Sequence, residues 1–122
     1  LPLHPRTREI IKKTSQHLNF KTIDPVGYFD MIQLIKNSEF VITDSKGLQK
    51  EAFFFKKFCI TLHDETEWIE LVNHEFNVVV GSDKDRILSE AKKTLHKTAN
   101  FNIDLYGNGK AAENIVKFIY RT

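Results

Sequence analysis

The 122 residues are enough for one domain, and 41% hydrophobic with 28% charged residues is typical of a globular protein. A formal net charge of +2, without a run of five basic residues, argues against a nucleic-acid partner. No apolar stretch approaches the roughly 18 residues that would predict a membrane span, and the single Cys59 excludes an internal disulfide and fits a reducing, cytoplasmic location.

Short apolar runs rich in β-branched residues predict five strands, at residues 1–3, 19–23, 40–42, 58–62 and 77–80. Between them, apolar side chains recur at helical spacing, most clearly at Tyr28, Met31 and Ile35. The first two predicted helices begin near Pro5 and Tyr28. The later helices are predicted at residues 48–55, 69–72, 84–96 and 110–120. Asp83 is the predicted N-cap of the helix at residues 84–96.

This alternation predicts an α/β fold, a Rossmann-like three-layer domain in which helices cover both faces of a parallel sheet. We expect residues 1–122 to form one such domain. Ligands bind beyond the carboxyl ends of the strands in such sheets. Polar loops at residues 4–7, 43–47 and 63–68 each follow a predicted strand, so we expect them to line one crevice.

The loop Thr-Asp-Ser-Lys-Gly at residues 43–47 connects a buried strand to a helix. A helix N-terminus offers free amide N–H groups and the positive end of the helix dipole, which together suit a phosphate or carboxylate. Ser45 adds a hydroxyl, Lys46 a positive charge, and Gly47 allows a close approach to the backbone. The alternative is an ordinary helix start capped by Asp44 or Ser45.

A metal site is a second candidate, since His63, Asp64, Glu65 and Glu67 lie together in sequence. No second histidine falls at the spacing of a metal-binding pair, so a solvated loop is the better interpretation. We therefore predict no metal in this chain.

Six short motifs occur in a specific order along almost the whole chain. They are His4-Pro5-Arg6-Thr7, Asp24-Pro25-x-x-Tyr28, Thr43-Asp44-Ser45-x-Gly47-Leu48-Gln49-x-Glu51-Ala52, Thr66-Glu67-Trp68-x-Glu70, Asn77-x-x-x-Gly81 and Tyr106-Gly107-x-Gly109. This series resembles the C-terminal domain of the non-hydrolysing UDP-N-acetylglucosamine 2-epimerases. The resemblance implies the second of two Rossmann-like domains in a glycosyltransferase-B-type fold, whose active site lies between them.

The resemblance also implies roles for individual residues. Ser45 and Gly47, with Lys46 between them, match the loop that holds the diphosphate, and Glu51 matches a glutamate that contacts the ribose hydroxyls. His4 matches a histidine near the phosphates and the sugar. Val26 and Met31 lie in the segment beside the uracil, and Trp68 occupies a position beside the nucleotide.

Two departures from the family pattern are lysines. Lys46 replaces the first glycine of the phosphate loop, and Lys50 replaces the first glutamate of a Gln-Glu-Glu sequence. A lysine at a position with positive φ would cost on the order of 1 kcal/mol. The Lys46 ammonium either pairs with the diphosphate or fills its space. The lost glycine and the nearby Lys50 favour the second outcome.

The function implied by the resemblance is interconversion of UDP-GlcNAc and UDP-ManNAc, in polysaccharide biosynthesis, by elimination and re-addition of UDP. The implied partners are a UDP-sugar, an N-terminal Rossmann domain in the same or another chain, and a second copy in a homodimer. No cofactor is implied. No catalytic residue is assigned here, because the acidic residues of the chemistry belong to the absent domain, so we expect the fragment alone to be inactive. A non-catalytic or degenerate nucleotide-sugar-binding module is the alternative, and an unrelated flavodoxin-like domain would leave the six motifs unexplained.

Overall fold

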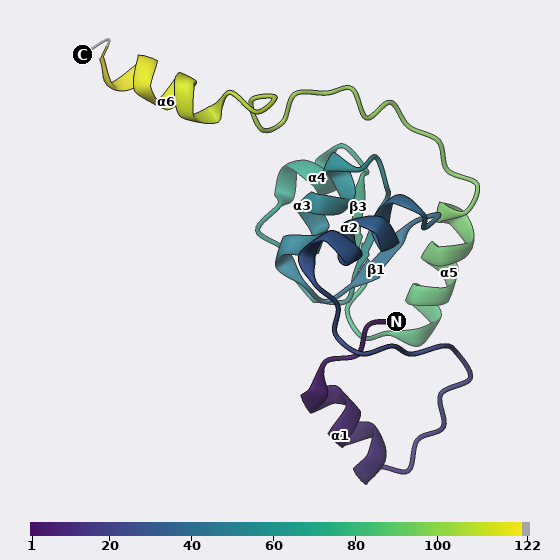
Figure 1. Cartoon of the computed structure of the whole chain (residues 1–122). Coiled ribbons are helices and arrows are strands. Elements are labelled where there is room, and N and C mark those ends of the chain that lie inside the picture. The colour runs from purple at the N-terminus through teal and green to yellow at the C-terminus, as the bar shows by residue number, and fades with distance from the viewer. Residues whose placement is uncertain (121–122) are drawn as a thin grey trace. The chain divides into compact units, whose positions relative to one another are not determined.

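The computed structural model describes residues 1–120, which fall into two compact units. The first unit is Leu1–Asn37 and the second begins at Ser38. Figure 1 labels the helices and strands in chain order. The prediction that residues 1–122 make one domain stays a prediction.

The first unit contains two helices, α1 (Pro5–Lys13) and α2 (Tyr28–Lys36). Both begin where the sequence predicts. Pro5 suits the first helical position because it lacks an amide hydrogen and its φ is already helical. His4 caps α1, and its Nδ1 atom accepts a hydrogen bond from the amide of Arg6 at 3.3 Å.

The two strands predicted in the first unit reduce to a single parallel bridge between Pro2 and Ile23. The amide of Leu3 donates to the Ile23 carbonyl, and the amide of Ile23 donates to the Leu1 carbonyl, both at 3.0 Å. Pro2 has no amide hydrogen with which to extend the ladder, and Pro5 and Pro25 interrupt it soon after. The prediction of full strands at residues 1–3 and 19–23 was therefore wrong.

The second unit is built on a parallel sheet with the order β1-β2-β3. Its strands are β1 (Val41–Thr43), β2 (Cys59–Thr61) and β3 (Asn77–Val79). All three lie within one residue of the predicted start, although each spans only three residues. The register aligns Val41, Cys59 and Asn77 across the sheet, so the carboxyl ends of all three strands meet at one edge.

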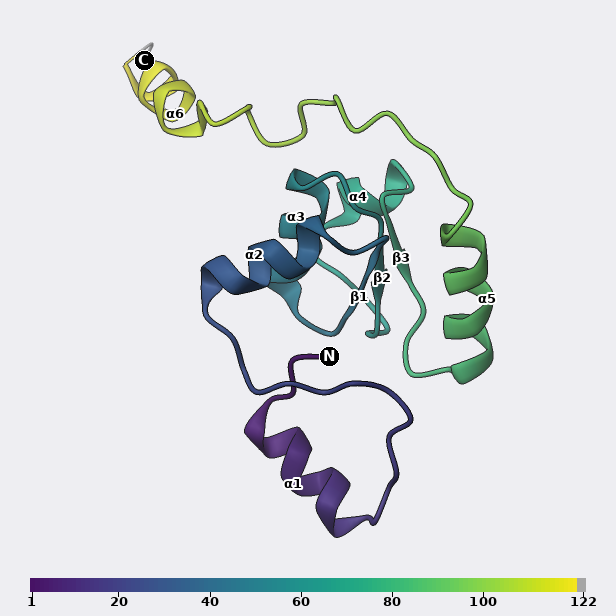
Figure 2. The same ribbon diagram turned by 45° about the vertical axis from the view of Figure 1, so that its right-hand side comes forward.

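Helices cover both faces of this sheet, as predicted, with α3 and α4 on one side and α5 on the other (Figure 2). Their bounds are α3 (Lys46–Phe54), α4 (Ile69–Asn73) and α5 (Lys84–Thr94). Asp83 caps α5, with Oδ1 accepting from the amide of Arg86 at 2.8 Å, which confirms the predicted cap. Helix α3 begins two residues earlier than predicted.

The hydrophobic core anchors α3 against the sheet. Ala52 and Phe53 are buried on its inner face, and Phe53 packs with Phe58, Leu71 and Phe76 in one cluster. Burial of several large side chains at roughly 2 kcal/mol each gives this cluster a substantial share of the stability. Because α3 is anchored in this way, its N-terminus is held at the carboxyl end of β1.

The last helix, α6 (Ala111–Ile119), has no buried residue. Its predicted apolar residues Ile115, Phe118 and Ile119 are all exposed. Across residues 1–120, no helix combines the length and the hydropathy that a bilayer span requires.

Candidate functional site

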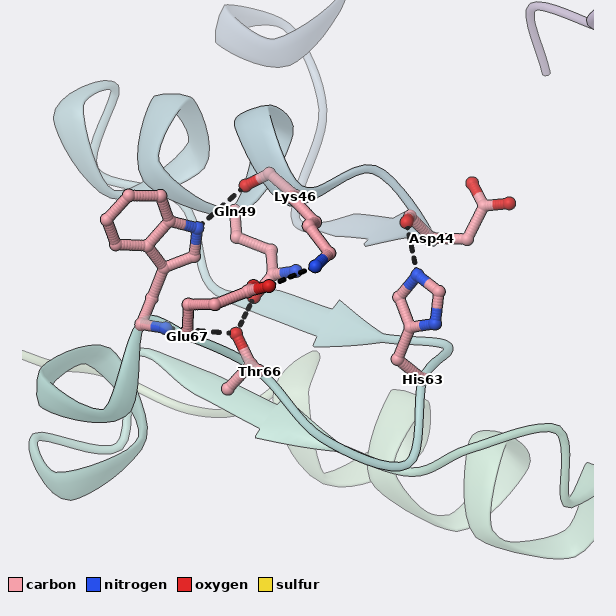
Figure 3. Close-up of polar contacts among 7 residues, drawn as sticks. Asp44, Lys46, Gln49, His63, Thr66 and Glu67 are labelled. Atoms are coloured by element: carbon pink, nitrogen blue, oxygen red, sulfur yellow. Dashed lines mark hydrogen bonds and ion pairs between the residues drawn. The ribbon is translucent and has the colours of Figure 1, made fainter.

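The loop between β1 and α3 forms a capped helix start. Ser45 is the N-cap, and its Oγ atom accepts a hydrogen bond from the amide of Leu48 at 3.5 Å. Thr43 Oγ1 in turn accepts from the amide of Ser45 at 3.0 Å. Of the two caps that the sequence allowed, the structure uses Ser45, and the Asp44 carboxylate points away from the other labelled side chains (Figure 3).

This cap leaves donors at the helix start. Helix geometry gives the first amides no intrahelical acceptor. Ser45 satisfies that of Leu48, while the amides of Lys46 and Gly47 have no acceptor within residues 1–120. The Ser45 hydroxyl uses a lone pair for the cap, so its hydrogen remains available to donate. Together with the helix dipole, these groups form an arrangement that can bind an anion.

Gly47 is the second residue of α3 and does not have a positive φ. A Cβ atom built at this position would meet nothing within 4 Å. Glycine in a helix costs roughly 0.5–1 kcal/mol relative to alanine. Neither the backbone nor the packing of the described residues requires a glycine here.

Lys46 is the first residue of α3, and its φ also lies outside the left-handed region. The backbone strain considered for a lysine at this position is therefore absent. Its side chain extends from the helix start toward the loop that follows β2.

Residues 63–68, which we call the β2 loop, contact the loop before α3 and the first residue of α3 at three points (Figure 3). His63 Nε2 donates to the Asp44 carbonyl at 2.7 Å, and Trp68 Nε1 donates to the Lys46 carbonyl at 2.9 Å. The third contact is an ion pair between Lys46 Nζ and a Glu67 carboxylate oxygen. Two of the three predicted loops are thus adjacent, as expected from the edge that they share.

The Lys46–Glu67 pair is exposed, with 65% and 54% of the two side chains accessible to solvent. The hydrogen bond and the charge of Glu67 raise the pKa of Lys46, and the hydrogen bond from Lys46 is the main cause that lowers the pKa of Glu67. A cavity of about 340 Å³ opens beside the pair. It is lined by Lys46, His63, Glu65, Thr66 and Glu67.

A buried polar network lies beneath this surface and centres on Gln49, which is 1% exposed. Gln49 Oε1 accepts from Thr66 Oγ1 at 2.6 Å and from Asn77 Nδ2 at 2.9 Å. Asn77 Oδ1 accepts from Thr61 Oγ1 at 2.8 Å, and Thr66 Oγ1 accepts from the amide of Trp68 at 3.2 Å. The network therefore links β2, β3, α3 and the β2 loop. Gln49 Nε2 is buried and has no acceptor among the described residues.

Lys50 packs against two aromatic rings. Its Nζ atom lies 4.4 Å from the centre of the Trp68 ring and 4.3 Å from that of Tyr106. These are cation–π contacts, which stabilise a lysine at this position. The two rings thus give Lys50 a packing role in the described structure.

The other predicted site residues are distributed over both units. His4, Val26 and Met31 belong to the first unit, where His4 is exposed and the other two are half-buried. Glu51 is half-buried on α3. Their roles toward a nucleotide stay predictions. Within residues 1–120, no group of three or more His, Cys, Asp or Glu side chains has the geometry to hold a metal ion.

Gln49 was not predicted as a site residue. A signal was present, because Gln49, Ala52 and Phe53 share the inward face of α3 at the spacing i, i+3, i+4. A polar residue in phase with two core residues indicates a buried hydrogen-bonding role. The partner of Lys46 left no comparable signal, since Glu67 is 21 residues away.

Comparison with known proteins identifies similar chains. The family model for UDP-N-acetylglucosamine 2-epimerase matches residues 1–120. The chain is 49% identical over 119 residues to the UDP-2,3-diacetamido-2,3-dideoxy-D-glucuronate 2-epimerase of Pseudomonas aeruginosa, a match covering 98% of this chain and 34% of that protein. It is 40% identical over 124 residues to a UDP-N-acetylglucosamine 2-epimerase homolog of Methanococcus maripaludis, covering 97% and 34%.

A solved structure shows the same fold. The UDP-GlcNAc 2-epimerase of Methanocaldococcus jannaschii, in complex with UDP-GlcNAc and UDP, matches with a TM-score of 0.80 and 37% identity, covering 99% of this chain and 35% of that one. The chain thus spans about a third of the length of its relatives. The extent of the family match shows that this chain belongs to the UDP-N-acetylglucosamine 2-epimerase family and corresponds to its C-terminal part.

Proposed function

We propose that this chain is the nucleotide-binding part of a UDP-sugar 2-epimerase and that the start of α3 holds the diphosphate of UDP. The observation that carries the proposal is Gly47, a helical glycine that the described fold does not require, beside amides and a hydroxyl that are free to donate. A helix start with such donors stabilises phosphate oxygens.

The proposed reaction is inversion at carbon 2 of the sugar through elimination and re-addition of UDP. The diphosphate is then the leaving group, and negative charge develops on it as its bond to the sugar breaks. Donors that are already oriented stabilise this charge more than that of the intact substrate, which lowers the barrier. In this proposal Ser45, Lys46 and Gly47 bind and orient the leaving group, while the acids and bases of the reaction lie outside this chain.

UDP-GlcNAc, giving UDP-ManNAc, is the first candidate substrate, because the family and the M. jannaschii complex carry that name. A second candidate is the diacetamido-glucuronate analogue, since the relative with 49% identity acts on it. Assays of both UDP-sugars with the complete polypeptide, followed by NMR, distinguish the two.

The experiment that tests the diphosphate site is Gly47→Ala in the complete polypeptide, with UDP affinity measured by calorimetry. The added methyl group enters the space proposed for the ligand, so we expect the affinity to fall about tenfold or more, equivalent to ~1.4 kcal/mol. Asp85→Ala, at the equivalent second position of α5, is the control and should leave UDP binding unchanged. Unchanged affinity in Gly47→Ala would contradict the proposal.

Glu51 is proposed to accept hydrogen bonds from the ribose hydroxyls, because a carboxylate suits a diol. Glu51→Gln should weaken UDP binding by about 1–3 kcal/mol if a charged hydrogen bond is lost. Equal affinities of the variant and the parent protein would rule out this role.

Turnover of a UDP-sugar distinguishes the proposed epimerase from the alternative, a non-catalytic binding module. The complete polypeptide should bind UDP under either interpretation. Conversion of a UDP-sugar supports the epimerase, whereas binding without conversion supports the module.

A further inference from the structure

The cavity beside the start of α3 has an unexpected charge for a site that is proposed to bind a diphosphate. Two of its lining residues, Glu65 and Glu67, are carboxylates, and its lysine, Lys46, is already paired with one of them. Carboxylates repel phosphate groups, and a neutralised lysine attracts them less. The arrangement in the structure therefore has to change when an anion binds.

The contacts of the β2 loop show which part can change. His63 and Trp68 bind backbone carbonyls, those of Asp44 and Lys46, and so hold the two loops together through the main chain. Thr66 is held by the buried Gln49. The ion pair joins only the ends of two exposed side chains. It can open by side-chain rotation alone, while the other contacts keep both loops in place.

We propose that Glu67 is an internal competitor that occupies Lys46 in the empty site, and that the diphosphate of the nucleotide displaces it and takes over the ammonium. This inference rests on the proposed function. Glu67 would then set the affinity for the diphosphate. The two outcomes considered for Lys46 both apply: its ammonium is paired with Glu67 in the empty site and binds the diphosphate in the occupied one.

Two further observations support an exchange. Exposed ion pairs are weak because water and salt screen both charges, so a phosphate group with more than one negative charge can compete. In addition, Gln49 Nε2 is a buried donor without an acceptor among the described residues, so the arrangement in the empty site leaves this polar group unsatisfied.

The test is a cycle of variants in the complete polypeptide, with UDP and uridine titrated by calorimetry. Glu67→Gln should tighten UDP binding by about threefold or more, because the competitor is removed. Uridine has no phosphate, so its affinity should not change. In a Lys46→Ala background the gain from Glu67→Gln should vanish. Glu65→Gln is the matched control, since it removes the same charge from the same cavity without an ion pair to Lys46 in the structure.

Several results would overturn the inference. They are an unchanged or weaker UDP affinity in Glu67→Gln, an equal gain in Glu65→Gln, or a gain that persists without Lys46. Failure of the parent protein to bind UDP at all would instead reject the proposed function. Both glutamates are exposed, so circular dichroism of each variant should match that of the parent protein.

Discussion

Two sets of contacts between polar side chains join α3 to the β2 loop, one buried and one exposed. The buried set is the Gln49 network, and the exposed set is the Lys46–Glu67 pair. In the buried set, loss of one partner leaves polar groups without water or protein to bind, which is costly. In the exposed set, water replaces a lost partner. The same two segments are thus held together by one set, while the other is free to exchange.

The largest expected effect comes from breaking the buried set with Gln49→Leu. This change leaves Thr66 and Asn77 without the acceptor that they share. We expect the free energy of unfolding to fall by roughly 1–3 kcal/mol, measured by urea denaturation of the complete polypeptide. Gln33→Leu, at an exposed position of α2, should change it little. Equal free energies of unfolding in the two variants would contradict a special structural role of the buried Gln49 network.

A second effect concerns Cys59, whose Sγ atom lies 3.8 Å from Thr61 Oγ1 at the buried end of the network. Burial raises the pKa of the Cys59 thiol from 9.0 to about 12. The unfolded chain therefore loses the Cys59 proton at a lower pH than the folded chain does. The contribution of the buried neutral thiol to the free energy of unfolding is intact below pH 9 and is lost as pH rises toward 12. The slope is at most about 1.4 kcal/mol per pH unit. Cys59→Ala should show a smaller loss of stability than the parent protein between pH 8 and 10, and parallel curves would contradict this.

The third prediction concerns Gly47, which lies on the exposed side. Gly47→Ala should raise the free energy of unfolding by about 0.5–1 kcal/mol, because alanine favours the helix and its methyl group meets no atom. The measurement is urea denaturation without nucleotide. A loss of stability would mean that the helix start has a structural need for glycine.

The smallest expected effect comes from breaking the exposed pair. Glu67→Gln should leave the midpoint of urea denaturation unchanged, since an exposed pair contributes little. The pair itself is present above the lowered pKa of Glu67 and is lost as pH falls through it. NMR of the Glu67 carboxyl group should show a pKa below 4.5 that rises in Lys46→Ala. An identical titration in both proteins would show that the pair does not form in solution.

Much of this arrangement is predictable from sequence, for a physical reason. The order of strands and helices follows from local hydrophobic spacing, so β1, β2, β3 and α5 were predicted nearly in place. The loop before α3 was predicted from its turn and cap residues. The prediction of strands in the first unit failed because a strand needs neighbouring strands to pair with as well as β-branched residues. Pro2 restricts such pairing there.

Side-chain partners were predicted less well. The pairing of Lys46 with Glu67 depends on rotamers of two long side chains from different loops, which no periodicity encodes. The position of Lys50 over Trp68 and Tyr106 depends on a segment more than 50 residues later in the chain. Lys50 suggested a weakened phosphate loop, which stays a prediction, while its contacts with two aromatic rings were not predicted.

Trp68 provides an intrinsic fluorescent probe of the candidate site. It is the single tryptophan of the chain, and its indole N–H binds the Lys46 carbonyl while the Lys50 ammonium lies over its ring. Indole emission responds to nearby charge and to the loss of a hydrogen bond. The intensity and wavelength of intrinsic fluorescence therefore report directly on the space between α3 and the β2 loop. Any rearrangement there should be visible in stopped-flow experiments without an added dye.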